Sequence, residues 1–280
     1  MNGLMPVGES DYTDTDFQRV QRIAQAQAGI HLPATKRALV YSRVSRRVRE
    51  LGHASFRTYL DFVQAPGGEG EMEKLVYALT TNVTSFFREK KHFEHLETVV
   101  VPRLAANIAA GGRGRVWSAA CSTGQEPWSI AMSIMTAFPD AAAHDMRILA
   151  TDINADVVAR AAGGVYPDEE TEGIPAARKA QFMESCGDGD YRFAGPIGRL
   201  PAFRVLNLNA SWPIRGTFSA IFCRNVVIYF DEATRERLWQ RLSDRLEPGG
   251  FLYVGHSERV SCATQCGLTQ VAPTIYEKDD

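Results

Sequence analysis

Apolar residues in the first quarter of the chain recur every three or four positions, which is the spacing of one face of an amphipathic helix. Three such stripes cover residues 14–63, and a fourth covers residues 71–79. Pro33 opens the second helix, Gly52 ends it, and a glycine-rich turn separates the third helix from the fourth. The pattern predicts a small all-helical region at the start of the chain.

Beyond residue 84 the pattern changes to short apolar runs that alternate with helical stripes. We predict strands at 116–120, 148–152, 203–208, 220–223 and 251–255. A predicted helix at 232–246 precedes the last of them. Alternating strands and helices build a parallel sheet with helices on both faces. The predicted fold class is therefore α/β, with a doubly wound and mostly parallel sheet.

Residues 166–201 interrupt this alternation. A predicted helix at 176–183 is followed by two short strands at 191–193 and 197–200, which suggests a small inserted antiparallel β subdomain. The predicted domains are a helical N-terminal domain at 11–70, a linker helix at 71–90, and an α/β domain at 91–280 with the insertion at about 167–202.

The connection between the first two predicted strands carries candidate chemistry. Residues 121–127 form a tight loop after the first strand, and Asp152 ends the second. Backbone N–H groups in such a loop can approach a ligand, and a carboxylate at the next strand end can accept both hydroxyls of a ribose. Gly124 is the one glycine of the loop, where a dinucleotide fingerprint has three, so a phosphate-free ligand is favoured. S-adenosylmethionine fits, although any strand-loop-helix unit could show this pattern.

Composition narrows the class of protein. The 280 residues carry a net charge of −2 and are 45% hydrophobic, which is typical of a protein with a substantial core and argues against nucleic-acid binding through overall charge. We find no targeting segment and no apolar run near the roughly 20 residues of a membrane span, so we expect a cytoplasmic protein.

The cysteines are scattered and odd in number, and they are Cys121, Cys186, Cys223, Cys262 and Cys266. Their spacing predicts reduced thiols and no metal site, since Cys262 and Cys266 alone are a very weak zinc signal.

The second predicted helix is strongly basic. Within that helix only Glu50 opposes the positive charges of Lys36, Arg37, Arg43, Arg46, Arg47 and Arg49. Lys36, Arg43 and Arg47 share one side at helical spacing, opposite the apolar stripe. This face is either a solvated surface or a binding surface for nucleic acid or an acidic protein.

Six motifs stand out along the chain. They are Thr81-Asn82-Val83-Thr84-Ser85-Phe86-Phe87-Arg88-Glu89, Trp117-Ser118-Ala119-Ala120, Gly124-Gln125-Glu126-Pro127, Thr151-Asp152-Ile153, Ile221-Phe222-Cys223-Arg224-Asn225-Val226-Val227-Ile228-Tyr229-Phe230-Asp231 and Gly255-His256-Ser257-Glu258. Together they closely resemble the chemotaxis receptor methyltransferases, the CheR family. The resemblance covers nearly the whole chain, and it implies a Rossmann-like methyltransferase fold.

The resemblance also implies an activity. Such an enzyme uses S-adenosylmethionine to esterify glutamate side chains on the cytoplasmic helices of bacterial chemoreceptors, with S-adenosylhomocysteine as the product. A carboxylate is already an anionic nucleophile at neutral pH, so methyl transfer needs alignment and removal of water rather than a catalytic base. An acidic substrate would explain a local basic patch. We expect a monomer with no nucleic-acid partner.

The resemblance carries residue roles as well. Arg88 would pair with the methionine carboxylate of the cofactor and steer the substrate carboxylate, and Tyr229 would orient the attacking carboxylate. The implied cofactor contacts are Asn82, Thr84, Arg88, Glu126, Asp152, Asn207, Leu208, Arg224 and Asn225. On the basic helix, Arg43, Arg46 and Arg47 are the candidate substrate-binding residues.

These roles have structural alternatives. Arg88 could instead pair with Glu89 or Glu94. Asp152 could cap the helix that begins near residue 155, and Tyr229 could be a packing residue.

The chain departs from the family pattern at three places. Cys121 stands where a small residue such as alanine is common. Many relatives have a glutamate where this chain has Gln125. Residues 185–190 are short for the loop that some relatives dock on the C-terminal tail of a receptor, so we expect tail binding to be absent or weak.

Two other functions stay open. A nucleic-acid methyltransferase would share the cofactor site, but the amine-targeting motif N-P-P-Y is missing after the fourth strand. A non-catalytic sensor of the cofactor would have no need of Arg88 and Tyr229, and both are present.

Overall fold

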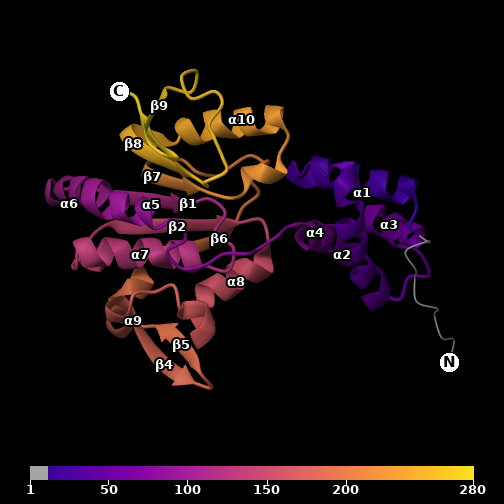
Figure 1. Cartoon of the computed structure of the whole chain (residues 1–280), viewed down its shortest axis with the longest axis horizontal. Helices are drawn as coiled ribbons and strands as arrows, with labels where there is room; N and C mark the ends of the chain where they lie inside the picture. Colours follow the sequence, from indigo (N-terminus) through magenta and orange to yellow (C-terminus); the bar gives the residue numbers. More distant parts are fainter. Residues whose placement is uncertain (1–11) are drawn as a thin grey trace. The chain divides into compact units, whose positions relative to one another are not determined.

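The computed structural model describes residues 12–280 and divides them into two compact units (Figure 1). A helical unit holds residues 12–81 together with Tyr229–Thr234. An α/β unit holds Asn82–Ile228 and Arg235–Asp280. Each unit is described separately.

The helical unit contains the four predicted helices. They are α1 (Asp14–Ala28), α2 (Arg37–Glu50), α3 (Phe56–Gln64) and α4 (Glu69–Leu79). Thr13 and Asp16 form a capping box at the start of α1, and Gly29 ends that helix with a left-handed φ of 69°. The apolar stripes point inward, as the burial of Val20 and Val44 shows.

The α/β unit is built on a seven-stranded sheet with the order β6-β2-β1-β7-β8-β10-β9. The strands are β1 (Gly114–Ser118), β2 (Met146–Asp152), β6 (Pro201–Val205), β7 (Phe218–Cys223), β8 (Leu246–Val254), β9 (Leu268–Ala272) and β10 (Ile275–Lys278). The first five pair in parallel, and β10 runs antiparallel to both of its neighbours. The helices are α5 (Lys90–His95), α6 (Val101–Ala109), α7 (Gln125–Ala137), α8 (Ala155–Gly163), α9 (Ala176–Phe182) and α10 (Glu232–Ser243). The doubly wound, mostly parallel α/β fold is confirmed.

Both faces of the sheet are covered. Val116 of β1 belongs to a large apolar cluster with Leu104 of α6 and Ile130 of α7. Neighbouring side chains of a strand point to opposite faces, and Trp117 packs instead against Trp212 and Phe218. Trp117 is fully buried, so the central strand has no solvated face.

The inserted subdomain is present, but one of its predicted strands is wrong. The three-stranded antiparallel sheet has the order β3-β5-β4, from β3 (Val165–Pro167), β4 (Met183–Gly187) and β5 (Asp190–Phe193) (Figure 1). Residues 197–200, predicted as a strand, lie in a 3-10 turn and its end. Pro196 lacks the N–H that a strand ladder requires, which favours the turn.

Several boundaries also differ from the sequence prediction. Strand β6 ends at Val205 rather than at residue 208, and helix α10 ends at Ser243. Strands β9 and β10 were not predicted. No helix spans 71–90, because α4 ends at Leu79 and α5 begins at Lys90.

Candidate functional site

The loop between β1 and α7 meets the end of β2, as the sequence predicts. Ser122 adopts a left-handed φ of 49°, and its backbone N–H donates to Asp152 Oδ2 at 2.9 Å. Asp152 Oδ1 accepts the N–H of Asn154 at 3.0 Å. Asn154, not Asp152, caps α8 by accepting the N–H of Asp156. The carboxylate is therefore fixed to the loop, with lone pairs remaining on both oxygens.

Asp152 is almost fully enclosed, with 8% of its surface exposed. Burial raises the pKa of this carboxyl, while hydrogen bonds from the backbone of Asn154, Ser122 and Ile153 oppose the shift. Such a carboxylate gains from hydroxyl donors that replace lost water, which is what a ribose supplies. The residues thus fit a nucleoside ligand.

A buried ion network lies at the start of α7. Glu126 accepts the hydroxyl of Ser118 at 2.7 Å and pairs with Arg224 at 3.1 Å. Arg224 also pairs with Glu89 at 3.4 Å, and its side chain is only 2% exposed. Burial raises the pKa of Glu126, and the charge of Arg224 is the main opposing influence. Arg224 therefore lies within the protein, where it joins two acidic side chains.

The turn that carries Arg88 has an unusual backbone. Phe87 and Glu89, on either side of it, both adopt left-handed φ angles, of 52° and 62°. Non-glycine residues in this region are strained and persist only where surrounding contacts hold them. The N–H of Phe87 donates to Ser129 Oγ at 3.0 Å, and Arg224 donates to the carbonyl of Arg88. These contacts fix the backbone around Arg88 and therefore the direction of its side chain.

Arg88 is not paired with an acidic neighbour. It donates to the carbonyl of Val83 at 3.3 Å, and its side chain is partly exposed. In the part of the chain that the structure describes, Glu89 pairs with Arg224 and lies close to His92 and His256, and no ion pair joins Arg88 to Glu89 or Glu94. The guanidinium group therefore keeps donors for a ligand.

The loop after β7 is held by a buried carboxylate that the sequence analysis did not assign a role. Glu258, 7% exposed, accepts the backbone N–H groups of Asn225 at 2.8 Å, Val227 at 3.0 Å and Gly255 at 2.6 Å. Asn225 has a left-handed φ of 58°. A side chain at Gly255 would meet Asn225 and Glu258, the closest contact being 2.4 Å. The motif Gly255-His256-Ser257-Glu258 is the signal that could have revealed this arrangement.

The other predicted cofactor contacts follow β6. The N–H of Leu206 donates to the carbonyl of Asp152, so the chain stays beside the end of β2 after the strand has ended. Asn207 follows, and its side chain accepts the N–H of Asn209 at 2.9 Å. Leu208 is buried. Asn207 therefore follows directly after a residue that is bonded to the end of β2, as expected for neighbouring strand ends.

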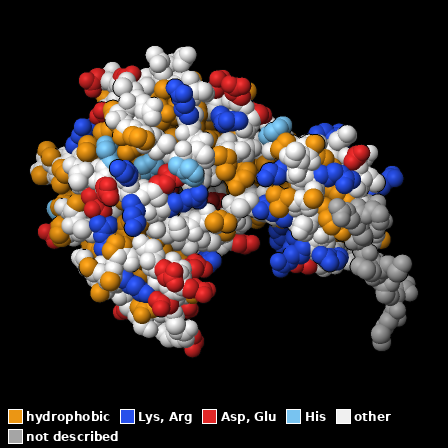
Figure 2. Space-filling model, in the orientation of Figure 1, with side chains coloured by type: hydrophobic (Ala, Val, Ile, Leu, Met, Phe, Trp, Pro, Cys, Tyr) orange, Lys and Arg blue, Asp and Glu red, His pale blue; other side chains and the backbone are white. Residues whose placement is uncertain are grey.

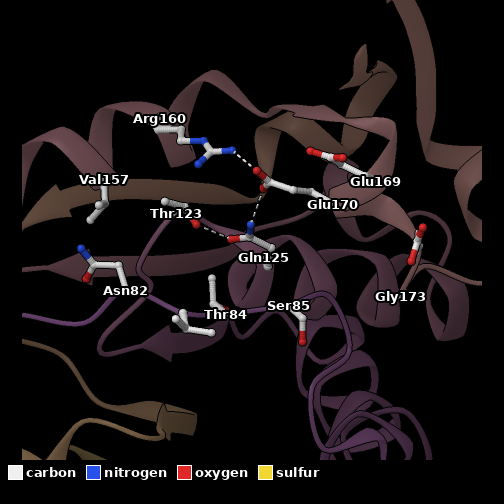
Figure 3. A pocket seen from close by; sticks show the side chains of 12 residues that line it. Asn82, Thr84, Ser85, Thr123, Gln125, Val157, Arg160, Glu169, Glu170 and Gly173 are labelled. Carbon is white, nitrogen blue, oxygen red and sulfur yellow. Dashed lines mark hydrogen bonds and ion pairs between the residues drawn. The ribbon is translucent and has the colours of Figure 1, made fainter. Parts of the chain in front are cut away.

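A polar cavity of about 620 Å³ opens beside this region (Figure 3). Of the predicted cofactor residues, Asn82 and Thr84 line it, whereas Asp152 and Glu126 do not. Gln125 accepts the hydroxyl of Thr123 and donates to Glu170 in its wall. A glutamate in place of Gln125 would lose the hydrogen bond to Glu170 and face the like charge of that residue.

Tyr229 lies in the helical unit, in the segment that joins β7 to α10. Its carbonyl accepts the N–H of His31 at 2.7 Å, and Phe230 forms a β-bridge with Ile30. Its predicted role stays a prediction.

The predicted substrate-binding arginines differ in their surroundings. Arg43 donates to the carbonyls of Leu79 and Thr80 at the end of α4. Arg47 forms a two-pronged pair with Glu71, at 2.9 and 2.6 Å. Arg46 is 79% exposed. It pairs with Glu50 of the same helix at 2.8 Å. Figure 2 shows Lys and Arg side chains gathered on the helical unit.

The part of the chain from residue 12 onward shows no group of three or more His, Cys, Asp or Glu side chains arranged for a metal. In the same residues, no helix has both the length and the apolar character needed to cross a bilayer.

A doubly wound sheet with a buried carboxylate at the end of its second strand and no phosphate-binding glycine loop defines a nucleoside-binding protein of the methyltransferase class. Residues 82–275 match the family model described as "CheR methyltransferase, SAM binding domain", and residues 15–80 match "CheR methyltransferase, all-alpha domain". The chain belongs to the CheR methyltransferase family, and its cofactor is S-adenosylmethionine.

Curated relatives support this membership over most of their lengths. A "Probable chemotaxis protein methyltransferase" of Rhizobium etli is 46% identical, over 90% of this chain and 95% of the relative. "Chemotaxis protein methyltransferase 2" of Pseudomonas aeruginosa is 40% identical, over 96% and 94%. "Chemotaxis protein methyltransferase" of Escherichia coli is 38% identical, over 89% and 86%. A solved methyltransferase from Corynebacterium glutamicum has a TM-score of 0.37 at 13% identity, over 69% of this chain and 96% of that one, and adds no weight to the assignment.

Proposed function

We propose that this protein methylates glutamate side chains of chemoreceptors, giving glutamate methyl esters. The observation that carries the proposal is the turn around Arg88. Strained backbone on both sides fixes a partly exposed guanidinium that is free of acidic partners, next to the buried network of Glu126 and Arg224. A fixed cation of this kind is suited to hold carboxylates, of the cofactor and of the substrate.

The chemistry needs little more from the protein. Bound S-adenosylmethionine supplies an electrophilic methyl group on a sulfonium sulfur, which a substrate carboxylate attacks in line. The carboxylates of Asp152, Glu126 and Glu258 are held by backbone N–H groups or in an ion pair, and this suits a reaction that requires no general base. Burial of Asp152, Arg224 and Glu258 favours a site from which water is excluded.

We assign roles on this basis. Arg88 and Tyr229 are the proposed catalytic residues, acting by orientation of the carboxylate. The proposed cofactor contacts are Asn82, Thr84, Arg88, Glu126, Asp152, Asn207, Leu208, Arg224 and Asn225. The observed pairs of Arg224 with Glu89 and Glu126 also give this residue a positioning role, because it holds the turn that carries Arg88.

The proposed substrate surface is the outer face of α2. Arg46 is its best candidate, since its side chain is 79% exposed and pairs only with Glu50 of the same helix, whereas Arg43 and Arg47 are engaged by α4 and Glu71. An acidic helical substrate complements this surface. We place the protein in the cytoplasm as a monomer, without nucleic-acid partners and without strong binding to a receptor tail.

Transfer of a radiolabelled methyl group to membranes that contain chemoreceptors tests the proposal. We expect label on the receptor that mild base releases, because carboxyl esters hydrolyse readily. In the same assay, with the same receptor membranes, Arg88→Ala and Tyr229→Phe should lower the rate of methyl transfer. Base-stable label on protein or RNA would show that the substrate group is not a glutamate carboxylate. Cofactor binding without any transfer would favour the sensor function instead.

A further inference from the structure

Two thiols that the methyltransferase site does not use lie in contact. Cys262 and Cys266 occupy the connection between β8 and β9, and their Sγ atoms are 3.1 Å apart. A disulfide bond is about 2.0 Å long, so the two sulfurs need to approach by only about 1 Å to bond. Both are free thiols in this structure.

The surrounding turn holds this geometry. The N–H of Cys266 donates to the carbonyl of Cys262 at 2.9 Å, which closes one turn of chain between them. The carbonyl of Cys266 accepts from Ser243 Oγ at 2.6 Å and from Lys278 Nζ at 3.0 Å. Leu268 donates to the carbonyl of Ala263 at 2.9 Å. The backbone of the pair is therefore anchored to α10 and β10.

The two thiols differ in accessibility. Cys262 is partly exposed, whereas Cys266 is 2% exposed. Burial, together with the neighbouring Cys262, raises the pKa of Cys266 to about 12, which keeps it as a thiol at neutral pH. An oxidant from solution therefore meets Cys262 first.

We propose that Cys262 and Cys266 form a reversible oxidation site that reacts with hydroperoxides. The Cys262 thiolate attacks one peroxide oxygen, the O–O bond breaks, and the released alkoxide or hydroxide takes a proton from solvent, which leaves a sulfenic acid. The sulfur of Cys266 then attacks the sulfur of Cys262, the S–O bond breaks, and the hydroxide leaves as water with the proton of Cys266. Two thiols lose two electrons in total, and the hydroperoxide gains them.

The sequence makes this site easy to observe separately. Cleavage after Arg259 and Lys278 yields one tryptic peptide, 260–278, that holds both cysteines and no other. Cleavage after Lys179 and Arg192 yields peptide 180–192, which holds Cys186 alone. Cys186 is exposed and is the internal control for a thiol without a neighbouring thiol.

The experiment treats the reduced full-length protein with hydrogen peroxide, blocks remaining thiols with N-ethylmaleimide in denaturant, and analyses the tryptic peptides by mass spectrometry. We expect peptide 260–278 to lose both maleimide labels and two hydrogen masses, and dithiothreitol to restore both labels. Cys186 should not form an internal disulfide. Retention of both labels on peptide 260–278, under conditions that oxidise Cys186, would overturn the proposal.

Two variants separate the steps. In Cys266→Ser the sulfenic acid of Cys262 has no partner, so dimedone should label Cys262. In Cys262→Ser the buried Cys266 should stay unlabelled by dimedone. Dimedone labelling confined to Cys266 in the second variant, with none of Cys262 in the first, would contradict the assigned order of attack. Because both variants change one atom at a position outside the proposed methyltransferase site, misfolding can be checked by methyl transfer.

Discussion

Substitution of Glu258 by glutamine is the sharpest test of how the loop after β7 is held. The carboxylate accepts three backbone N–H groups, at 2.6, 2.8 and 3.0 Å. Glutamine keeps the shape and one acceptor oxygen. With that oxygen toward Gly255 and Asn225, its amide group turns donors toward the N–H of Val227. At least one hydrogen bond to a charged acceptor is then lost, and such a bond typically contributes about 1.5–3 kcal/mol.

We therefore expect Glu258→Gln to lower the free energy of unfolding by roughly 1.5–3 kcal/mol. Denaturant unfolding measures this value, and hydrogen exchange of the Asn225 and Val227 amides shows whether the loss is local. Exchange at both amides should accelerate, and methyl transfer should slow. Glu236→Gln, on the exposed side of α10, is the control and should stay within about 0.5 kcal/mol of the wild type. Unchanged stability with unchanged protection of both amides would refute the reasoning.

Three further predictions test other parts of the molecule. Asp152→Asn should weaken S-adenosylmethionine binding by at least about tenfold in calorimetry, because a neutral amide has one acceptor oxygen where the carboxylate has two. An unchanged affinity would show that Asp152 does not bind the ribose. Arg47→Met leaves the buried Glu71 carboxylate uncompensated and should lower the free energy of unfolding, measured by thermal unfolding, by about 3–5 kcal/mol. The control Arg46→Met should be nearly neutral. Similar losses of stability in the two variants would contradict the structural role of Arg47. Burial, followed by the charge of Arg224, lowers the pKa of His92 to about 4. Between pH 6.5 and pH 4 the unfolded state therefore binds more protons at this residue than the folded state does. The free energy of unfolding should fall as the pH drops through that window. His92→Gln should flatten this part of a stability–pH curve, and an unaltered slope would assign the effect to other groups.

The sequence predicted the sheet well where physical constraints are local. The β1 loop and the end of β2 were placed correctly, since a buried parallel strand reads as an apolar run and polar residues mark its end. Strand β9 was missed because it is an edge strand whose exposed residues, such as Thr269 and Gln270, interrupt any apolar run. Strand β10 lies inside the sheet but has only four residues, which is too short for a clear pattern.

The partners of charged residues could not be predicted. The sequence analysis gave Arg224 as an implied cofactor contact but did not predict that it lies buried between Glu89 and Glu126, which are far from it along the chain. Glu258 received no role for the same reason: its three donors come from two segments that only the folded sheet brings together. Long-range ion pairs of this kind leave no periodic signal in a single sequence.

The helical unit includes a segment that the ribosome makes long after its helices. Ile30 bridges to Phe230, and Gln25 donates to Asp231, across about two hundred positions of sequence. The four helices can collapse early, but these contacts cannot form until the chain has been synthesised to residue 234. A fragment that stops at Thr81 would lack Tyr229–Thr234, which belongs to the same compact unit. The helical unit is therefore completed late in biosynthesis, after strand β7 and the segment Tyr229–Thr234 that follows it have been made.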